Sequence, residues 1–190
     1  KRHPVRAGCI KLGTSQAPMT QLEKKTFRAG ARAWKRTGVH ITTHCTVMGA
    51  ETSQLSILDD EGVDLRRVVI GHVSWHLMDP GYRKTMLEWM KRGANFMPTN
   101  LDVRKPENWR LLIEAIHQAF DAGYGSQLLF GMDHGYCTET GVFTRVHFMP
   151  QPPWLYMFQN VLPVFRSLGL TPAEEQAIMI DNPRRMLPVQ

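Results

Sequence analysis

A chain of 190 residues, 43% hydrophobic and 21% charged, is long enough to bury one sizeable core, so we expect a single globular domain over residues 1–190 rather than a disordered or fibrous protein. It contains no run of about 18 apolar residues and no signal-like apolar segment after its basic start, which argues against a membrane partner and favours a cytoplasmic location. The net charge of +6 is spread over several segments without a recognition motif, which argues against a nucleic-acid partner.

The first predicted unit is a strand followed by a helix. Residues 7–12 form a short apolar run closed by Gly13, which is typical of a buried parallel strand that ends in a polar loop. Thr20 and Glu23 then make a capping-box pattern, and an apolar stripe continues until Gly38. The sequence therefore predicts a helix between Thr20 and Gly38.

The second and third units repeat this plan. Residues 39–45 are rich in β-branched side chains and predict a strand, and residues 51–61 predict a helix that Gly62 ends. Residues 67–72 predict a compact third strand, and residues 80–92 carry apolar side chains at helical spacing. Each of these strands is thus followed by one predicted helix.

The fourth unit is less regular at its start. Residues 94–97 predict a short strand that Pro98 interrupts. The apolar residues from Trp109 to Phe120 then recur at helical spacing and predict an amphipathic helix.

The fifth unit ends the series. Residues 127–132 predict a strand, and a long loop over residues 133–152 follows it. Two helices are predicted after the loop, over residues 154–168 and 172–180, and Thr171 begins a second capping-box pattern before the last of them.

Five alternations of strand and helix, spaced about 25 to 35 residues apart, predict a parallel α/β fold. Periodicity alone leaves two arrangements open, a closed barrel and an open doubly wound sheet. Neither a Gly-x-Gly-x-x-Gly motif nor a Walker-type loop follows any predicted strand, which weakens the nucleotide-binding form of the open sheet.

Polar side chains occupy the ends of otherwise apolar predicted strands. The residues at the ends of the first, second, third and fifth strands are Lys11, His44, His72 and Asp133. Taken singly, a strand-end histidine is better explained by a hydrogen bond in the core. Four such residues on separate strands need a shared partner, because burying an unpaired charge is unfavourable. A divalent metal is the natural partner, since imidazole and carboxylate ligate zinc, manganese or iron.

Four short segments carry a resemblance to a known family. They are Arg-Ala-Gly-Cys-Ile-Lys at residues 6–11, Ile-Thr-Thr-His at 41–44, Val-Ile-Gly-His at 69–72 and Asp-Asn-Pro-Arg-Arg at 181–185. In this order they resemble landmarks of phosphotriesterase-related proteins of the amidohydrolase superfamily, over nearly the whole chain. The resemblance implies an α/β fold that is a partial (β/α)8 TIM barrel, to which this chain supplies strands 4 to 8 with their helices.

The resemblance also implies a role for each polar residue. Lys11 matches a lysine that is carboxylated by carbon dioxide and bridges two divalent metals, for which we expect zinc, with manganese, iron or cobalt as alternatives. His44 and His72 match ligands of the second metal. Asp133 matches a ligand of the first metal that accepts the proton of the nucleophile, so it is the expected catalytic residue. A carbamate is an anionic ligand, whereas a lysine ammonium cannot ligate a metal.

One part of the family's metal site has no counterpart in the chain. The family's first strand carries a His-x-His pair that completes the first metal site, and His40 and His44 do not replace it. A complete barrel of this type has about 250 residues, more than are present here. We therefore expect a fragment of a larger hydrolase, whose partner is the missing N-terminal portion of the barrel or another copy of the chain.

Residues beside the expected metal site bear on the substrate. Trp75 stands where the family has an acidic proton relay, for which His76 or Asp79 is a candidate substitute. Trp75 itself either lines an apolar leaving-group pocket or packs in the core. The loop after the fifth strand, which includes His134 and Tyr136, is either the substrate-specificity loop or an ordinary surface excursion.

Two features have ordinary explanations. The three cysteines are too few and too scattered for a disulfide framework and are expected to be reduced packing residues: Cys9, Cys45 and Cys137. A basic stripe on the first helix is expected to be a solvated outer face, with an anionic partner as the alternative: Lys24, Arg28, Arg32 and Arg36.

Two functions follow from these observations. The leading hypothesis is a metal-dependent hydrolase that cleaves an ester-type bond in a small molecule, which is a lactone, a carboxyl ester or a phosphotriester. The alternative is a truncated, non-catalytic half-barrel that acts as a binding or assembly module. Metal content and turnover distinguish the two.

Overall fold

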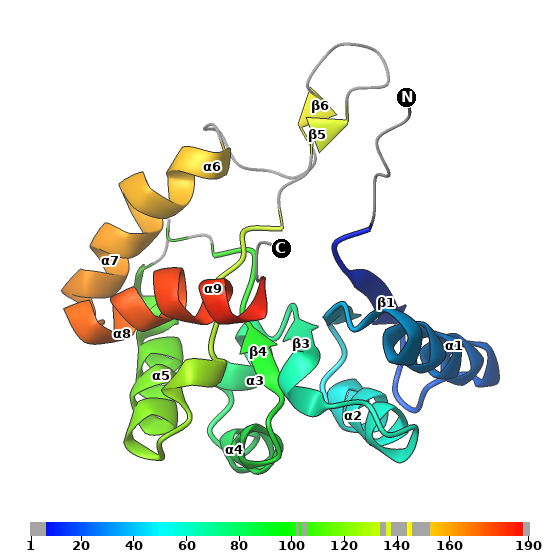
Figure 1. Ribbon diagram of the computed structural model, residues 1–190. Coiled ribbons are helices and arrows are strands. Elements are labelled where there is room, and N and C mark those ends of the chain that lie inside the picture. The colour runs from blue at the N-terminus through cyan, green and yellow to red at the C-terminus, as the bar shows by residue number, and fades with distance from the viewer. Residues whose placement is uncertain are drawn as a thin grey trace.

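The computed structural model describes residues 7–101, 103, 106–133, 136–137, 144–145 and 153–187. Its centre is a parallel sheet of four strands in the order β1-β2-β3-β4 (Figure 1). The strands are β1 Ile10–Thr14, β2 Ile41–Cys45, β3 Val68–Gly71 and β4 Asn95–Met97. The predicted parallel α/β fold is confirmed.

Helices connect the strands and cover one face of the sheet. They are α1 Gln21–Thr37, α2 Ala50–Asp60, α3 Ser74–Met78, α4 Arg83–Lys91 and α5 Arg110–Asp121. Two short 3-10 turns lie between these helices, η1 Leu65–Arg67 and η2 Pro106–Trp109, and a third, η3 Gly125–Gln127, follows α5. In β2 the residues alternate between buried and half-buried, so only one face of that strand is sealed by the helix layer.

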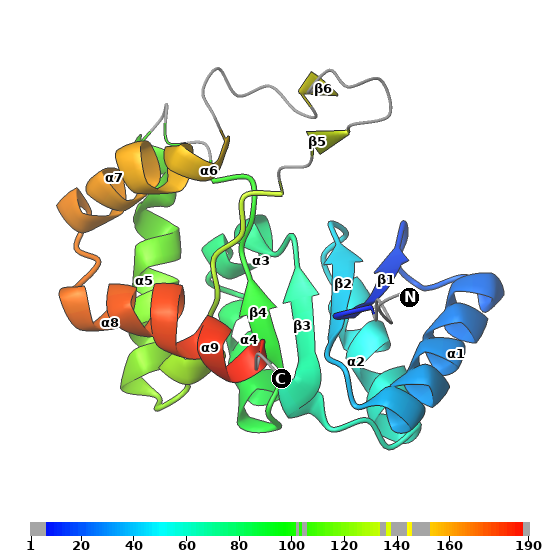
Figure 2. The same cartoon turned by 45° about the horizontal axis from the view of Figure 1, so that its top comes forward.

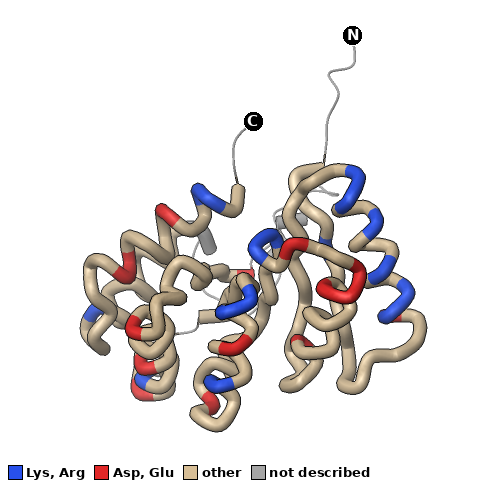
Figure 3. Tube along the Cα trace, turned by 60° about the horizontal axis from the view of Figure 1, so that its bottom comes forward, with Lys and Arg blue, Asp and Glu red and all other residues tan. Residues whose placement is uncertain are grey.

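Helix α1 forms where the sequence predicts it. Its N-cap Thr20 accepts from the backbone N–H of Glu23, and the Glu23 side chain bonds back to Thr20, which completes the capping box. Gly38 ends the helix with a φ of 69°, a left-handed conformation that glycine adopts without a steric penalty. Basic residues recur along α1 (Figure 3). Arg28, Arg32 and Arg36 are exposed, Lys24 is half-buried, and Arg28 pairs with Glu61 at 3.5 Å.

The helix predicted over residues 80–92 is confirmed as α4, whereas the short helix α3 that precedes it was not predicted. The chain forms two helices after β3, α3 and α4, separated by a turn. The Asp79 carboxylate accepts from the backbone N–H groups of Gly81 and Tyr82 and so stabilises that turn. Side-chain capping of this kind competes with helix continuation, and the apolar spacing alone does not reveal it.

The predicted fifth strand is also modified. Leu128 makes an isolated parallel bridge with Phe96, and the backbone N–H of Leu129 donates to the Phe96 carbonyl at 3.0 Å. This segment continues the sheet beyond β4 without forming a regular strand. In the following loop, β5 Tyr136–Cys137 and β6 Thr144–Arg145 pair antiparallel, and the other residues of 134–152 lie outside the described part of the chain.

The C-terminal region contains two longer helical stretches, each with a π-helical centre. The first comprises α6 Pro153–Tyr156, η4 Met157–Val161 and α7 Leu162–Ser167. The second comprises α8 Pro172–Gln176, η5 Ala177–Asp181 and α9 Asn182–Met186. These stretches lie beyond β4, on the side away from α1 (Figure 2). No helix in the described ranges is long and apolar enough to cross a membrane.

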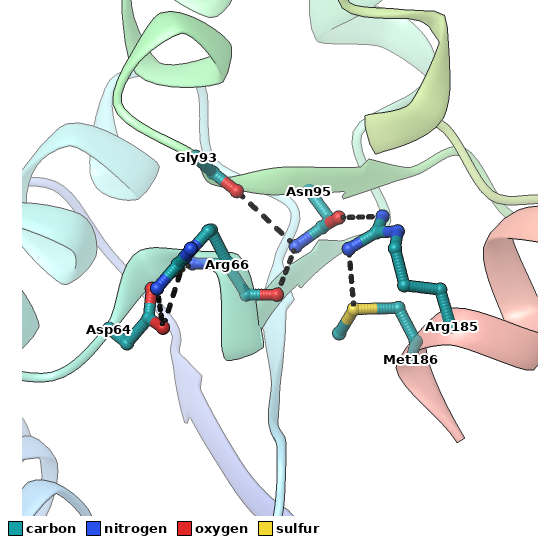
Figure 4. A network of polar contacts seen from close by, with 6 residues as sticks. All are labelled: Asp64, Arg66, Gly93, Asn95, Arg185 and Met186. Atoms are coloured by element: carbon teal, nitrogen blue, oxygen red, sulfur yellow. Dashed lines mark hydrogen bonds and ion pairs between the residues drawn. The ribbon is translucent and has the colours of Figure 1, made fainter. Parts of the chain in front are cut away.

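A polar network ties α9 to the sheet (Figure 4). Arg185 donates to the Asn95 side-chain oxygen at 2.9 Å, and Asn95 donates in turn to the Val68 carbonyl at 2.9 Å. Asn182 donates to the carbonyls of Gly125 and Leu128 at 3.0 and 2.7 Å. The terminal helix therefore holds the irregular segment that continues the sheet and leads to Asp133.

Candidate metal centre

Parallel pairing gathers His44, His72 and Asp133 at one edge of the sheet, whereas Lys11 is the second residue of β1 and pairs with Thr42, two residues before His44. Lys11 lies on β1 and His44 on β2, His72 directly follows β3, and Asp133 follows the segment that pairs with β4. Because parallel strands share their direction, their carboxyl ends meet at one edge, as Figure 2 shows for β2, β3 and β4. The fold thus brings together four residues that are far apart in the sequence.

Distances within this group are short. The rings of His44 and His72 have their centroids 4.4 Å apart, and Nδ1 of His72 lies 3.7 Å from Oδ2 of Asp133. Partial burial lowers the pKa of Lys11, and the Asp133 carboxylate opposes that shift through its charge. The amine, the two imidazoles and the carboxylate therefore share one neighbourhood.

Neighbouring side chains hold two of these four residues in place, namely His72 and Asp133. The Thr99 hydroxyl lies 2.9 Å from Nδ1 of His72, and Thr99 is itself fixed by reciprocal hydrogen bonds with the buried hydroxyl of Ser74. The Asn100 amide donates to Oδ2 of Asp133 at 3.5 Å. Sequence reasoning missed Thr99 and Asn100, although both follow β4 in the position where the other strands carry their polar residues.

Backbone strain is concentrated at the same place. Among the described residues, three that are not glycine have a positive φ: His72 at 65°, Asn100 at 55° and Asp133 at 52°. Such conformations cost of order 1 kcal/mol each and persist where the surrounding structure imposes them, often at functional sites. All three follow the strands whose ends form this edge, so the strain coincides with the edge that carries the expected ligands.

Gly71 is required by close packing just before His72. A Cβ at this position would lie 2.7 Å from the backbone oxygen of Thr43 on the neighbouring strand. Only glycine therefore lets β3 approach β2 closely enough for the His72 and His44 rings to meet.

The structure places Trp75 and His76 outside this group. Trp75 is 67% exposed on α3, so the interpretation that it packs in the core is wrong. His76, expected beside His72 as a proton relay, is 1% exposed and contacts Glu51 instead, because α3 turns it into the helix layer. Tyr136 contributes its backbone to β5, and His134 lies outside the described residues.

A second group of ligand-type side chains lies within the helix layer. Cys45, Glu51 and His76 are all buried, and one potential ligand atom from each lies within 4.8 Å of the others. The sequence predicted only packing for Cys45 and helix for Glu51, since their spacing matches no metal motif.

Comparison with known proteins places the chain among relatives over almost its full length. A model of the Phosphotriesterase family matches residues 2–187. A phosphotriesterase homology protein of Mycobacterium tuberculosis is 29% identical over 188 residues, which cover 96% of this chain and 55% of that protein. An N-acetyltaurine hydrolase of Dictyostelium discoideum is 28% identical, with coverages of 97% and 50%. A phospho-furanose lactonase of Mycoplasmopsis synoviae is 24% identical over 187 residues.

A solved structure of a relative is similar to this chain in its fold as well as in its sequence. The phosphotriesterase homology protein of Escherichia coli, crystallised with phosphate in its active site, superimposes with a TM-score of 0.74 and 26% identity. The match covers 96% of this chain and 60% of that one. The chain therefore spans little more than half the length of the relatives it matches.

Proposed function

The chain belongs to the phosphotriesterase family, a family of hydrolases, and on this basis we propose that it forms the metal-binding part of a metal-dependent hydrolase. The proposed reaction is cleavage of an ester-type bond in a lactone, a carboxyl ester or a phosphotriester. The observation that carries the proposal is the meeting of Lys11, His44, His72 and Asp133 at one strained edge of the sheet.

This donor set fits divalent cations. Imidazole nitrogens and a carboxylate oxygen suit zinc, manganese, iron or cobalt, and the two rings already lie side by side. His44 and His72 would hold one metal, Asp133 would hold the other, and Lys11 would bridge them as a carbamate. When bound, such cations supply Lewis acidity that makes water nucleophilic near neutral pH.

The chain's own residues have separate tasks in the proposed reaction. The lowered pKa of Lys11 increases the fraction of neutral amine, which is the form that reacts with carbon dioxide to give the carbamate. The Asp133 carboxylate accepts the proton of the nucleophile, and the Asn100 amide holds that carboxylate. Thr99 orients the His72 ring.

The remaining ligands of the first metal come, in this proposal, from outside the sequence. The family's His-x-His pair has no match here, so the rest of the barrel or a second copy of the chain would supply it. Measuring the mass of the assembly that binds two metals per site distinguishes a partner that supplies the rest of the barrel from a second copy of this chain. An active monomer of this chain alone would contradict both.

Hydrolysis should be measured with a substrate panel on the assembly of this chain with the rest of the barrel, or on the oligomer of this chain, loaded with zinc or manganese. The panel contains a lactone, an aryl carboxyl ester, a phosphotriester and an N-acyl taurine, because relatives are named as lactonase and N-acetyltaurine hydrolase. We expect turnover that chelation abolishes and metal restores, and a fall of about 10²–10⁴-fold in Asp133→Asn.

The control is His117→Gln, which removes an imidazole that pairs with Glu174 on the far side of the fold. It should retain the activity of the wild type. No turnover on any substrate, together with one metal or none per chain, would favour the non-catalytic binding module instead.

A further inference from the structure

The buried group of Cys45, Glu51 and His76 lies on the opposite face of β2 from the centre described above. His44 and Cys45 are consecutive on the strand, so their side chains point to opposite faces. Cys45 and Glu51 are 0% exposed and His76 is 1% exposed, on β2, α2 and α3 respectively. Three elements thus contribute one ligand-type side chain each to a dry position inside the helix layer.

Two separations within this group match those of neighbouring ligands around a small cation, and the potential ligand atoms all lie within 4.8 Å of one another. Sγ of Cys45 lies 3.7 Å from Oε2 of Glu51, and Nδ1 of His76 lies 3.4 Å from the same oxygen. Zinc bonds of about 2.0–2.3 Å in tetrahedral geometry place neighbouring ligand atoms roughly 3.3–3.7 Å apart. A direct bond between a charged imidazole and a carboxylate would be shorter, about 2.7–2.9 Å.

Among the described residues, no lysine or arginine pairs with Glu51. Glu51 accepts from the backbone N–H of Gly49 at 3.0 Å, and the one ion pair that it makes in the described part of the chain is with His76. Burial lowers the pKa of His76 and so favours the neutral ring. Nδ1 of His76 is buried without a hydrogen-bond partner among the described residues, and burial and the charge of Glu51 raise the pKa of the neighbouring Tyr82 hydroxyl. A buried carboxylate beside an unpartnered imidazole nitrogen is an incomplete arrangement.

A catalytic cysteine does not explain the group. Burial and the neighbouring Glu51 raise the pKa of Cys45, and its sulfur is fully enclosed. A nucleophilic cysteine needs a lowered pKa and access to substrate. Coordination is different, because a metal displaces the thiol proton and stabilises the thiolate where it lies.

We propose that Cys45, Glu51 and His76 form a second, structural cation site of the zinc type, distinct from the hydrolytic centre. Binding releases the Cys45 proton to solvent and forms bonds from Sγ, Oε2 and Nδ1 to the cation. The site joins α2 and α3 to the end of β2, directly behind His44. Its existence does not depend on the proposed hydrolysis, since its ligands face the helix layer.

Cobalt is the probe for this site. A Co²⁺–thiolate bond gives a charge-transfer absorption, whereas the proposed hydrolytic centre has only nitrogen and oxygen donors. We expect this absorption in the full chain and in His72→Ala. Cys45→Ser should lose the absorption and should bind one equivalent of metal fewer than the wild type. The thiol control Cys9→Ser, at an exposed position, should retain it. Absence of the band from the saturated wild type, or its persistence in Cys45→Ser, would overturn the proposal.

A second measurement needs no variant and covers the case in which Cys45→Ser does not fold. X-ray absorption of the zinc-loaded wild type should show one sulfur scatterer at about 2.3 Å in addition to nitrogen and oxygen. A shell of nitrogen and oxygen alone would overturn the site. Neither readout uses turnover, so loss of hydrolysis and loss of this site remain distinguishable.

Discussion

At the scale of single residues, the metal centre depends on side chains that do not themselves ligate. Thr99 lies 2.9 Å from Nδ1 of His72 and is held in place by Ser74. Thr99→Val keeps the shape of the side chain and removes this bond, so the His72 ring loses its fixed orientation. We expect zinc affinity to fall about 10–100-fold, measured by titration against a competing chelator.

The matched control for this prediction is Thr37→Val. The Thr37 hydroxyl donates to the Ala33 carbonyl at the exposed end of α1, which precedes the amino end of β2, whereas His44 lies near the carboxyl end of that strand. Its zinc affinity should equal that of the wild type. Equal affinities for Thr99→Val and Thr37→Val would show that Thr99 does not position His72.

Gly71 is a second residue whose role is steric. An added methyl group would meet the Thr43 backbone oxygen at 2.7 Å, and a strand backbone has little freedom to yield. We expect Gly71→Ala to lower the free energy of unfolding by about 1–3 kcal/mol in urea denaturation. Gly8→Ala, where the new Cβ meets nothing within 4 Å, should leave the denaturation midpoint unchanged.

At the scale of elements, the capping box of α1 gives a pH-dependent contribution to stability. Hydrogen bonds from the backbone N–H groups of Ser15 and Thr20 lower the pKa of Glu23 to about 2. The contribution is therefore present above the ordinary glutamate pKa and is lost as the pH falls towards 2. Glu23→Gln should destabilise the protein by about 1 kcal/mol at pH 7.

Denaturation curves at several pH values check this sign. The stability difference between wild type and Glu23→Gln should narrow below the ordinary glutamate range and nearly vanish by pH 2. Glu88→Gln, at an exposed position of α4, serves as the control and should show no comparable narrowing. A difference that grows as the pH falls would contradict the assigned hydrogen bonds.

Elements with local signals were predicted well, and those that depend on distant contacts were not. The capping pattern and Gly38 located α1 because both act within one turn of helix. The irregular fifth strand depends for its pairing on Phe96, which lies on the preceding strand β4. Apolar periodicity indicates which residues are buried, but it does not indicate where the pairing of a strand becomes irregular.

At the scale of the whole molecule, α9 stabilises the edge that carries Asp133. Asn182 is 3% exposed and bonds to two backbone carbonyls, those of Gly125 and Leu128. Asn182→Ala leaves both carbonyls unsatisfied, so we expect a loss of about 1–3 kcal/mol in thermal or urea unfolding. The exposed Arg184→Ala on the same helix is the control and should change stability little.

The sequence by itself determined the alternation of strands and helices and the identity of four polar residues in or after the strands. Both patterns depend only on the spacing of residues that are close in the sequence. Only the tertiary structure decided that Lys11, His44, His72 and Asp133 meet, since convergence follows from parallel pairing between distant segments. Tertiary packing likewise placed His76 with Cys45 and Glu51 in the helix layer. A side chain's chemistry is local, whereas its partners are set by the sheet and helices that enclose it.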